Sequence, residues 1–279
     1  MRISILLMGL FIFTTLYLSA NPQTDWQKDG LQGKVKSFTC DYETTTYNPQ
    51  GYIESFTSEF GDTSTVYTYD AKGRLISSVC TDQDGKFSFG TTKTYDASGL
   101  LITSEEKDTF GCSISNYNYN AQKQLTRINI TSIDNTLLYA DEYLYDSDGN
   151  NIRINNYEED AKEPWSYSIF AYDKKNKLVE KRDYERSAGE QPVAVYKYDA
   201  EGLLTEETRY HKAALDTKMS VYYDKYCNVT LNQVYFAKSN ETNITKFIYT
   251  YDKKGNWLTR EEYRGSKLNH KLEREITYY

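Results

Sequence analysis

Acidic side chains are the most numerous groups in this 279-residue sequence that could do chemistry, with 40 Asp and Glu against 33 Lys and Arg. A pair of carboxylates could serve a glycoside hydrolase, but carboxylates scattered along a chain are mostly solvated surface charges. The stretches Asp82–Gly85 (DQDG) and Asp146–Gly149 (DSDG) hint at calcium, yet an EF-hand loop needs further oxygen ligands and a closing Glu. We interpret both stretches as turns.

No other motif for catalysis or metal binding is present in the sequence. His211 and His270 are the only histidines, and neither has a metal-ligand spacing such as His-Glu-x-x-His. The sequence also lacks a Cys-x-x-Cys pair, a P-loop and the Gly-x-Ser-x-Gly and Gly-x-Gly-x-x-Gly motifs. We therefore predict a protein that is not an enzyme, with no catalytic residue, no cofactor and no metal site.

Aromatic side chains are the better candidates for function, because the chain has 28 Tyr beside 11 Phe and 3 Trp. An aromatic face on a sheet can stack on sugars or contact a partner protein, or it can simply form the core, and both interpretations are open. Trp165 in the stretch KEPWSY is our first candidate for ligand contact, because Trp is favoured at binding hot spots. The other candidate ligand-binding residues are Tyr67, Tyr117, Tyr143, Tyr196 and Tyr249.

Each of these five tyrosines stands two positions before a repeated phrase, Tyr-Asp-x-x-Gly-x-Leu. The phrase occurs in nine copies at intervals of 22 to 28 residues. Its second position is Asp or Asn in every copy, and its fifth position is Gly in six copies and Asn in a seventh. The tyrosines that open the copies are Tyr47, Tyr69, Tyr95, Tyr119, Tyr145, Tyr172, Tyr198, Tyr223 and Tyr251.

The phrase predicts a β-hairpin. Asp-x-x-Gly favours a type I turn that ends in a left-handed residue, where Gly carries no steric penalty. The opening Tyr then faces the apolar residue six positions later, as Tyr69 faces Leu75, and on the other face we expect Thr68 to pair with Ile76. The repeat length predicts strands of about eight residues and a second, irregular and charged loop in each copy.

The predicted fold is all-β: a repetitive antiparallel array of about nine hairpins, roughly 17–18 strands, that forms one long twisted or spiralling sheet. No composition break divides the chain after its first 20 residues. We therefore expect a single repeat domain over residues 21–279.

The recurring phrases resemble the YD repeats of RHS-repeat proteins and teneurins, over nearly all of the chain after residue 20. The resemblance implies a long antiparallel sheet that spirals, which closes into a shell in large members, and an exported setting. Exported bacterial members often carry a toxin behind an Asp-Pro self-cleavage region. This sequence has no Asp-Pro dipeptide, and a repeat-like sequence pattern continues to Tyr279. We therefore expect a short exported bacterial member without a toxin domain and without a closed cargo shell.

The first 20 residues have the composition of a secretory signal peptide: Arg2, an apolar run over residues 3–17 and a small-residue cleavage site at residues 18–20. An uncleaved anchor is the alternative. We predict export to the periplasm, the cell surface or the medium, with no membrane span in the mature chain. The net charge of -7 argues against nucleic acid as a partner. The cysteines, which export could leave free or paired, are Cys40, Cys80, Cys112 and Cys227.

These observations favour an exported, non-enzymatic repeat scaffold that binds a protein or glycan partner through its loops or a sheet face. An outer-membrane β-barrel is the alternative, but it needs an apolar face on every strand. The stretch LLTEETRYH places Glu206 on one face and Glu207 and Arg209 on the other. A third class, an envelope enzyme that acts on glycans, has no motif in its support.

Overall fold

The computed structural model describes residues 24–188 and 192–279. The predicted signal peptide, residues 1–20, lies outside the described residues. The elements are α1 (Asp25–Lys28), β1 (Val35–Cys40), β2 (Glu43–Tyr47), β3 (Ile53–Ser58), β4 (Thr63–Tyr69), β5 (Leu75–Asp82), β6 (Phe87–Tyr95), β7 (Leu101–Asp108), β8 (Cys112–Tyr119), β9 (Leu125–Ser132), β10 (Leu137–Tyr145), β11 (Asn151–Glu158), β12 (Ser166–Tyr172), β13 (Leu178–Glu185), the 3₁₀-helix η1 (Arg186–Ala188), β14 (Ala194–Tyr198), β15 (Leu204–His211), β16 (Ala214–Tyr223), β17 (Val229–Phe236), β18 (Glu241–Tyr251), β19 (Trp257–Arg264) and β20 (Lys267–Tyr278).

Each repeated phrase forms the predicted turn. In the second copy the N–H of Gly73 donates to the carbonyl oxygen of Asp70 at 3.0 Å, and the Asp70 carboxylate accepts from the N–H groups of Lys72 and Arg74. Gly73 and Gly255 have φ of 76° and 94°, as the turn requires. The same left-handed conformation occurs at Lys123, Asn176 and Cys227, where the sequence lacks Gly.

The hairpin register is also as predicted at the opening Tyr. Tyr69 pairs with Leu75, and the equivalent pair forms in all nine hairpins. The expected pairing of Thr68 with Ile76 is wrong, because Thr68 pairs with Ser77. A bulge after the turn leaves Ile76 without a partner and shifts the register by one residue.

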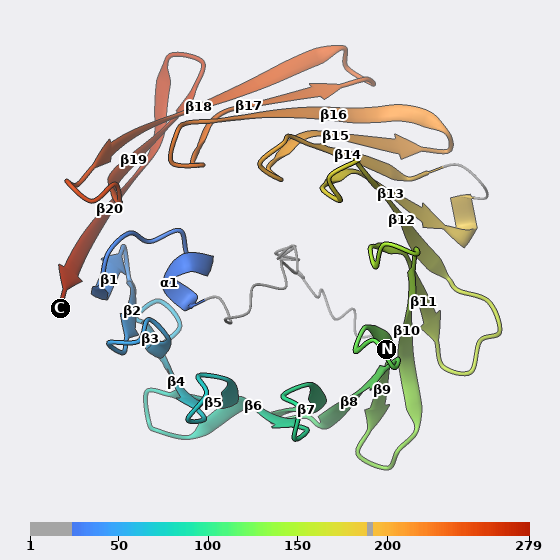
Figure 1. Cartoon of the computed structure of the whole chain (residues 1–279). Helices are drawn as coiled ribbons and strands as arrows, with labels where there is room; N and C mark the ends of the chain where they lie inside the picture. The colour runs from blue at the N-terminus through green and yellow to red at the C-terminus, as the bar shows by residue number, and fades with distance from the viewer. Residues whose placement is uncertain (1–23, 189–191) are drawn as a thin grey trace.

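The sheet closes into a 20-stranded barrel, because β1 pairs with β20 in addition to β2. Figure 1 shows the resulting ring of strands, with β1 and β20 side by side. The expectation of an open, twisted or spiralling sheet of roughly 17–18 strands is therefore wrong, although the all-β hairpin array is correct. The nine phrases account for the hairpins from β2 to β19, and β1 and β20 flank them. The pairing of β1 with β20 removes the two exposed edges that an open array would leave.

The face that carries the repeated tyrosines lines the inside of the barrel. Helix α1 lies within the ring (Figure 1), and its Asp25 accepts a hydrogen bond from the Tyr69 hydroxyl at 2.9 Å. The Tyr47 hydroxyl likewise donates to Asp29 at the end of α1, at 2.5 Å. Alternate residues of a strand share a face, so the antiparallel registers extend this inner face around all strands.

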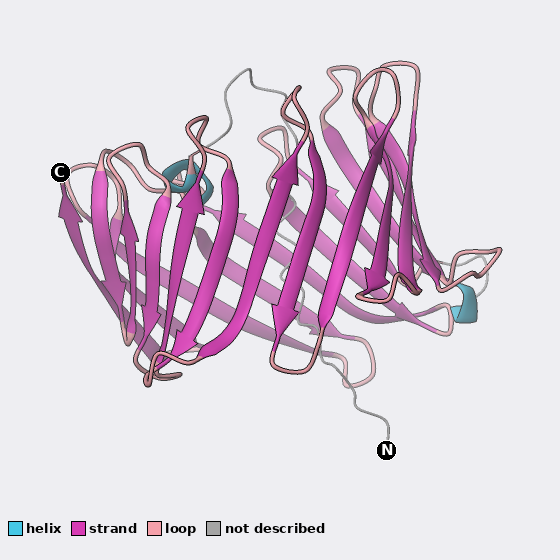
Figure 2. Cartoon of the chain, turned by 90° about the horizontal axis from the view of Figure 1, so that it is seen from below, coloured by secondary structure: helices cyan, strands magenta, loops and turns pink. Residues whose placement is uncertain are grey.

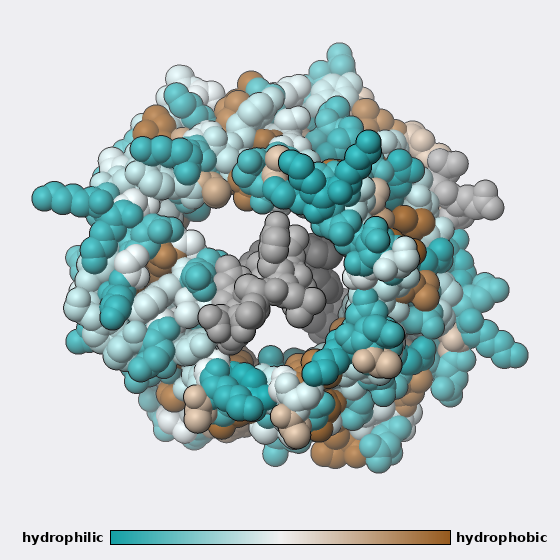
Figure 3. All heavy atoms as spheres, in the orientation of Figure 1, coloured by the Kyte–Doolittle hydropathy of each residue, from teal (hydrophilic) through white to brown (hydrophobic). Residues whose placement is uncertain are grey.

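The packed core is small and lies beside α1. Leu31, Val35 and Tyr47 are buried there, and Trp26 donates its indole N–H to the carbonyl oxygen of Val35 at 2.8 Å. Elsewhere most inner rings are half-buried, with Phe170 as a buried exception, because a barrel of more than about 16 strands is too wide for side chains to fill. Figure 3, viewed along the barrel, shows partly open space inside the ring.

Two further observations concern the described residues. No helix among them is long and apolar enough to cross a lipid bilayer. The four cysteines are free thiols, and they lie on β1, β5, β8 and in the turn before β17.

Candidate binding surfaces

The barrel has two different rims, because turns and loops alternate along the antiparallel strands. The nine turns of the repeated phrases and α1 lie at one rim, which we call the turn rim. The ten loops that follow the odd-numbered strands lie at the other, which we call the loop rim. Figure 2 shows the two rims from the side, with α1 at the upper rim and η1 at the lower.

The tyrosines that open the phrases form a ladder of hydrogen bonds along the inner wall. In five of the nine copies the hydroxyl of the opening Tyr donates to the main-chain carbonyl oxygen of the seventh phrase residue in the preceding hairpin. Tyr119, for example, donates to Leu101 at 2.9 Å, and Tyr145 donates to Leu125 at 2.8 Å. The same bond forms from Tyr95, Tyr172 and Tyr223. These five bonds each tie a hairpin to its neighbour, which is a structural role, whereas Tyr47 and Tyr69 donate to α1 and Tyr251 donates to Asp224.

The five other tyrosines proposed as ligand contacts also face the lumen and are half-buried. Burial raises the pKa of each of their hydroxyls, so these are neutral phenols at ordinary pH. They lie on β4, β8, β10, β14 and β18, so they are spread around the whole wall and do not form one compact site. These residues are Tyr67, Tyr117, Tyr143, Tyr196 and Tyr249.

Trp165 lies apart from these tyrosines, in the loop between β11 and β12 at the loop rim. Its side chain is exposed, and its main chain is held by bonds from Trp165 to Asn156 and from Arg186 to Trp165, both at 2.9 Å. The guanidinium of Arg186 also donates to the carbonyl oxygens of Glu163 and Pro164. The loop thus has a fixed backbone and presents an indole ring to solvent.

Trp165 belongs to a row of exposed apolar side chains in five of the first six loops of the loop rim; the loop between β5 and β6 carries none. Phe60 and Phe110 are the most exposed large apolar side chains of the described residues, and exposed apolar groups mark interaction surfaces when several lie together. We call this row the apolar tips: Tyr42 (62% exposed), Phe60 (90%), Phe110 (96%), Ile133 (68%) and Trp165 (44%).

The loops that carry the apolar tips are acidic. The six loops from β1 to β12 contain eight acidic and two basic residues, a net charge of −6. The described residues of the other four loops include Arg186, Lys212 and Lys238 and no acid. One half of the loop rim is therefore apolar and negative, and the other half is positive.

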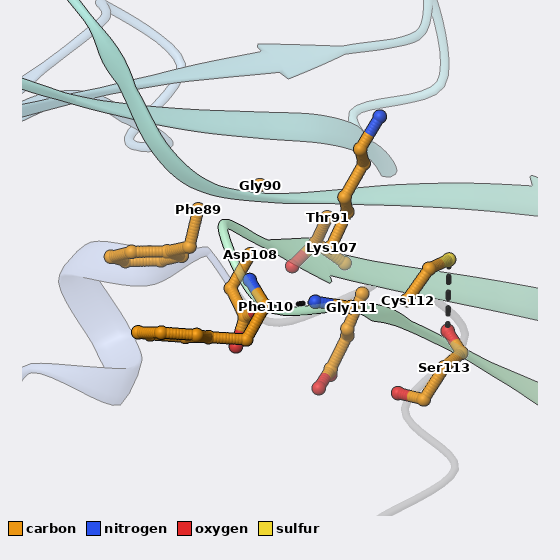
Figure 4. Close-up of a pocket in the computed structure, with 10 residues that line it drawn as sticks. Phe89, Gly90, Thr91, Lys107, Asp108, Phe110, Gly111, Cys112 and Ser113 are labelled. Carbon is orange, nitrogen blue, oxygen red and sulfur yellow. Dashed lines mark hydrogen bonds between the residues drawn. The ribbon is translucent and has the colours of Figure 1, made fainter. Parts of the chain in front are cut away.

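A cavity of about 550 Å³ is lined by strands β6, β7 and β8 and by the loop between β7 and β8. Phe89, Glu106 and Ser113 line it from the inner face, and Phe110 lies at its edge. Figure 4 shows the rings of Phe89 and Phe110 on the same side of this cavity. The carboxylate of Asp108 accepts from the N–H groups of Phe110 and Gly111 at 2.7 and 2.8 Å, which fixes the loop.

Sequence reasoning identified Trp165 and missed the other four apolar tips. Tyr42, Phe60, Phe110 and Ile133 each stand beside or within a short stretch of Asp, Gly or Asn between two strands. A large apolar residue inside a predicted polar loop is the signal that could have identified them. Among the described residues, no cluster of three or more His, Cys, Asp or Glu could hold a metal ion.

Fold and surfaces together define the class of this protein: a closed antiparallel barrel of tyrosine-ladder hairpins, with one regular rim and one variable rim. Residues 69–111 match the family model of the RHS Repeat. The chain therefore contains the RHS repeat, and the resemblance that the Tyr-Asp phrases indicated is confirmed.

Solved structures similar to this chain include two kinds of protein. The crystal structure of TcdB2-TccC3 is 14% identical with a TM-score of 0.38, and the match covers 81% of this chain and 15% of that one. A porin-like protein from Bacteroides uniformis is 12% identical with a TM-score of 0.37, over 88% of this chain and 99% of that one. This chain thus spans only a small part of the TcdB2-TccC3 chain. No curated protein sequence matches it.

Proposed function

We propose that this protein is an exported binding scaffold, not an enzyme, and that it docks a partner protein on the apolar tips of its loop rim. The observation that carries the proposal is the row of large apolar side chains in five of the first six loops, exposed by up to 96%. Such residues gain most from being covered, because each buries a large apolar area on contact.

The charge around the apolar tips indicates the kind of partner. A net charge of −6 over the six loops favours a partner surface that is apolar at its centre and basic at its edge. The cavity beside Phe110 would accept a side chain of that partner. A glycan would also stack on Trp165, but the alternation of aromatic tips and carboxylates favours a protein.

The outer wall supports a scaffold over the outer-membrane barrel that the sequence left as the alternative. Lys197 pairs with Glu206 across β14 and β15, on the face opposite Tyr196. The Glu206 carboxylate bonds to Lys197 at 2.9 Å and to Lys218 at 2.8 Å. Lys271 and Glu273 form a further outward pair at 2.6 Å. A lipid-facing wall would carry apolar residues at these positions.

The test is capture of a partner from envelope extract, with identification by mass spectrometry and repetition with the purified partner. The double variant Phe60→Ser, Phe110→Ser should lose the partner, and binding by the wild type should weaken as salt increases. The matched control is Val66→Ser, Ile244→Ser, which removes two exposed apolar side chains from the outer wall.

Equal binding of the partner by the rim and wall variants would overturn the proposal that the apolar tips form the docking surface. A glycan array run beside the capture distinguishes a sugar ligand, and binding of sugars alone would overturn the protein partner. Hydrolysis of any glycan or peptide by the purified protein would overturn the non-enzymatic assignment.

A further inference from the structure

Two arginines of the inner wall, Arg260 and Arg274, lie next to the seam where the barrel closes. Arg274 on β20 pairs with Cys40 on β1, and Arg260 on β19 pairs with Leu272, two residues before Arg274. The two side chains are therefore diagonal neighbours on one face, with Cβ atoms about 7 Å apart. The face is the inner one, because Ile276, two residues further along β20, packs on the core beside α1.

These arginines differ from the rest of the described chain in their partners. The other seven arginines each bond to an oxygen atom: three are hydrogen-bonded to amide or main-chain carbonyl oxygens and four form ion pairs. Among the described residues, Arg260 and Arg274 have neither kind of partner: Nε of Arg274 is buried without an oxygen acceptor, and the polar group beside it is the thiol of Cys40. Guanidinium groups away from bulk water are normally paired, so this pair lacks an anion.

Aromatic rings hold both guanidinium groups in place. The central carbon of the Arg274 guanidinium lies 3.5 Å from the ring centre of Trp257 and 4.8 Å from that of Phe38. The Arg260 guanidinium lies 5.8 Å from the ring centre of Phe247. Stacking on a ring fixes the plane of the guanidinium and leaves its N–H edge free to donate.

The local charges also favour an anion. Burial lowers the pKa of Arg274, the neighbouring Cys40 and Tyr47 raise it, and the positive charge of Arg260 lowers it. On the inner face, Glu262 follows Arg260 by two residues on β19 but forms its ion pair with Arg264, and Asp29 accepts from the Tyr47 hydroxyl. No carboxylate of the described residues forms an ion pair with Arg260 or Arg274. An anion bound between the arginines would relieve the repulsion between them.

We propose that Arg260 and Arg274 form a site inside the barrel for an oxyanion, a carboxylate or a phosphate, carried by a ligand that enters the lumen. Both oxyanions match the two parallel N–H donors of a guanidinium. The rings of Tyr249 and Trp257, 6.3 Å apart, flank the pair and offer an apolar contact for the remainder of the ligand. The site is independent of the loop rim.

Isothermal titration calorimetry on the full chain tests this site with three probes: trigalacturonic acid, inorganic phosphate and the neutral sugar cellotriose. We expect binding of at least one acidic probe and none of cellotriose. The preferred acidic probe distinguishes a carboxylate ligand from a phosphate ligand. Loss of one charged hydrogen-bond donor in Arg260→Gln should weaken binding about tenfold or more.

The matched control is Arg209→Gln, which removes a lumenal arginine that Glu207 already neutralises. Its affinity should stay within about twofold of the wild type, since no ligand contact is lost. A thermal melt of Arg260→Gln confirms that the variant is folded. Absence of binding by both acidic probes, equal binding of cellotriose, or equal losses in the two variants would each overturn the proposal.

Discussion

The hydroxyl of Tyr95 donates a hydrogen bond of 2.9 Å to the carbonyl oxygen of Leu75, which lies 20 residues earlier in the preceding hairpin. A side chain thus satisfies a main-chain acceptor at the point where β5 extends beyond its pairing with β6. The sheet gains five such bonds along the ladder.

Removal of the Tyr95 hydroxyl should therefore lower stability without changing the shape of the ring. We expect Tyr95→Phe to lower the free energy of unfolding by about 1 kcal/mol, the usual net value of one hydrogen bond. The control is Tyr139→Phe, because the half-exposed Tyr139 hydroxyl has no hydrogen-bond partner among the described residues. Urea titrations of both variants provide the measurement, and equal losses would show that the Tyr95 bond is not stabilising.

Two glycines with the same backbone conformation should respond differently to the same substitution. Gly73 and Gly202 have φ of 76° and 87°, so Ala at either position costs about 1 kcal/mol of backbone strain. A Cβ at Gly202 meets open space, whereas one at Gly73 overlaps the ring of Tyr52. Denaturant melts should therefore show a clearly larger loss for Gly73→Ala. Equal losses would mean that Tyr52 moves aside freely.

Acid should weaken the turns. Hydrogen bonds from the N–H groups of Leu100 and Lys177 hold the pKa of Asp96 and Asp173 below the ordinary 3.8. The stability that these two carboxylates contribute is fully present above pH 3.8. It is lost as the pH falls below 3.8, because the folded state then binds fewer protons than the unfolded state. The melting temperature of the wild type should fall in this range.

The double variant Asp96→Asn, Asp173→Asn should show a shallower fall in melting temperature over the same pH range. Asn is compatible with the turn, since Asn48 accepts the equivalent bonds from the N–H groups of Gln50 and Tyr52. Asp148→Asn is the control, because the Asp148 carboxylate accepts no hydrogen bond among the described residues. An unchanged slope in the double variant would contradict the turn argument.

The closure of the barrel can be tested with a cross-strand disulfide. Ser37 on β1 faces Thr277 on β20, with their hydroxyl oxygens 2.7 Å apart. Facing residues of antiparallel strands are close enough for a disulfide. Ser37→Cys, Thr277→Cys should therefore oxidise within one chain, as seen by a lost pair of free thiols in mass spectrometry. In the control, Ser37→Cys with Thr259→Cys on β19, the new thiols should stay free. The opposite result would indicate an open sheet.

Truncation of Trp165 in its loop and of Trp257 in the barrel wall should have different effects on stability. The main-chain bonds of Trp165 survive truncation of its exposed side chain, so Trp165→Ala should change stability by no more than about 0.5 kcal/mol. Trp257 is half-buried against Arg274, and Trp257→Ala should cost about 3 kcal/mol. Thermal melts of the two variants measure these stability changes. A collapse of the Trp165 variant would place that residue in the core.

Local structure was predictable from the sequence because it depends on neighbouring residues. The Asp70–Gly73 turn and the pairing of Tyr69 with Leu75 follow from the geometry of a seven-residue phrase. The pairing of Thr68 was missed by one residue, because the bulge occupies a position that the phrase does not mark.

Global closure was not predictable in the same way. No sequence pattern in β1 or β20 specifies the other strand as its pairing partner. Whether a long sheet closes depends on the twist that accumulates over many hairpins. The arginine pair was missed for the same reason, because Phe38 and Cys40 reach Arg274 only after closure. The apolar tips were missed because loops were treated as uniformly polar.

Closure also has a consequence for how the chain folds. Each hairpin joins residues close in sequence and can form early, whereas the seam joins residues 240 positions apart. Loop closure of this length has an entropic cost that grows only slowly with length, so the seam can form last on a nearly complete sheet. Until then both edge strands are exposed and can pair with another chain. The slowest productive step is then the meeting of β1 with β20, and high protein concentration during refolding should divert chains from rings into open, end-to-end polymers.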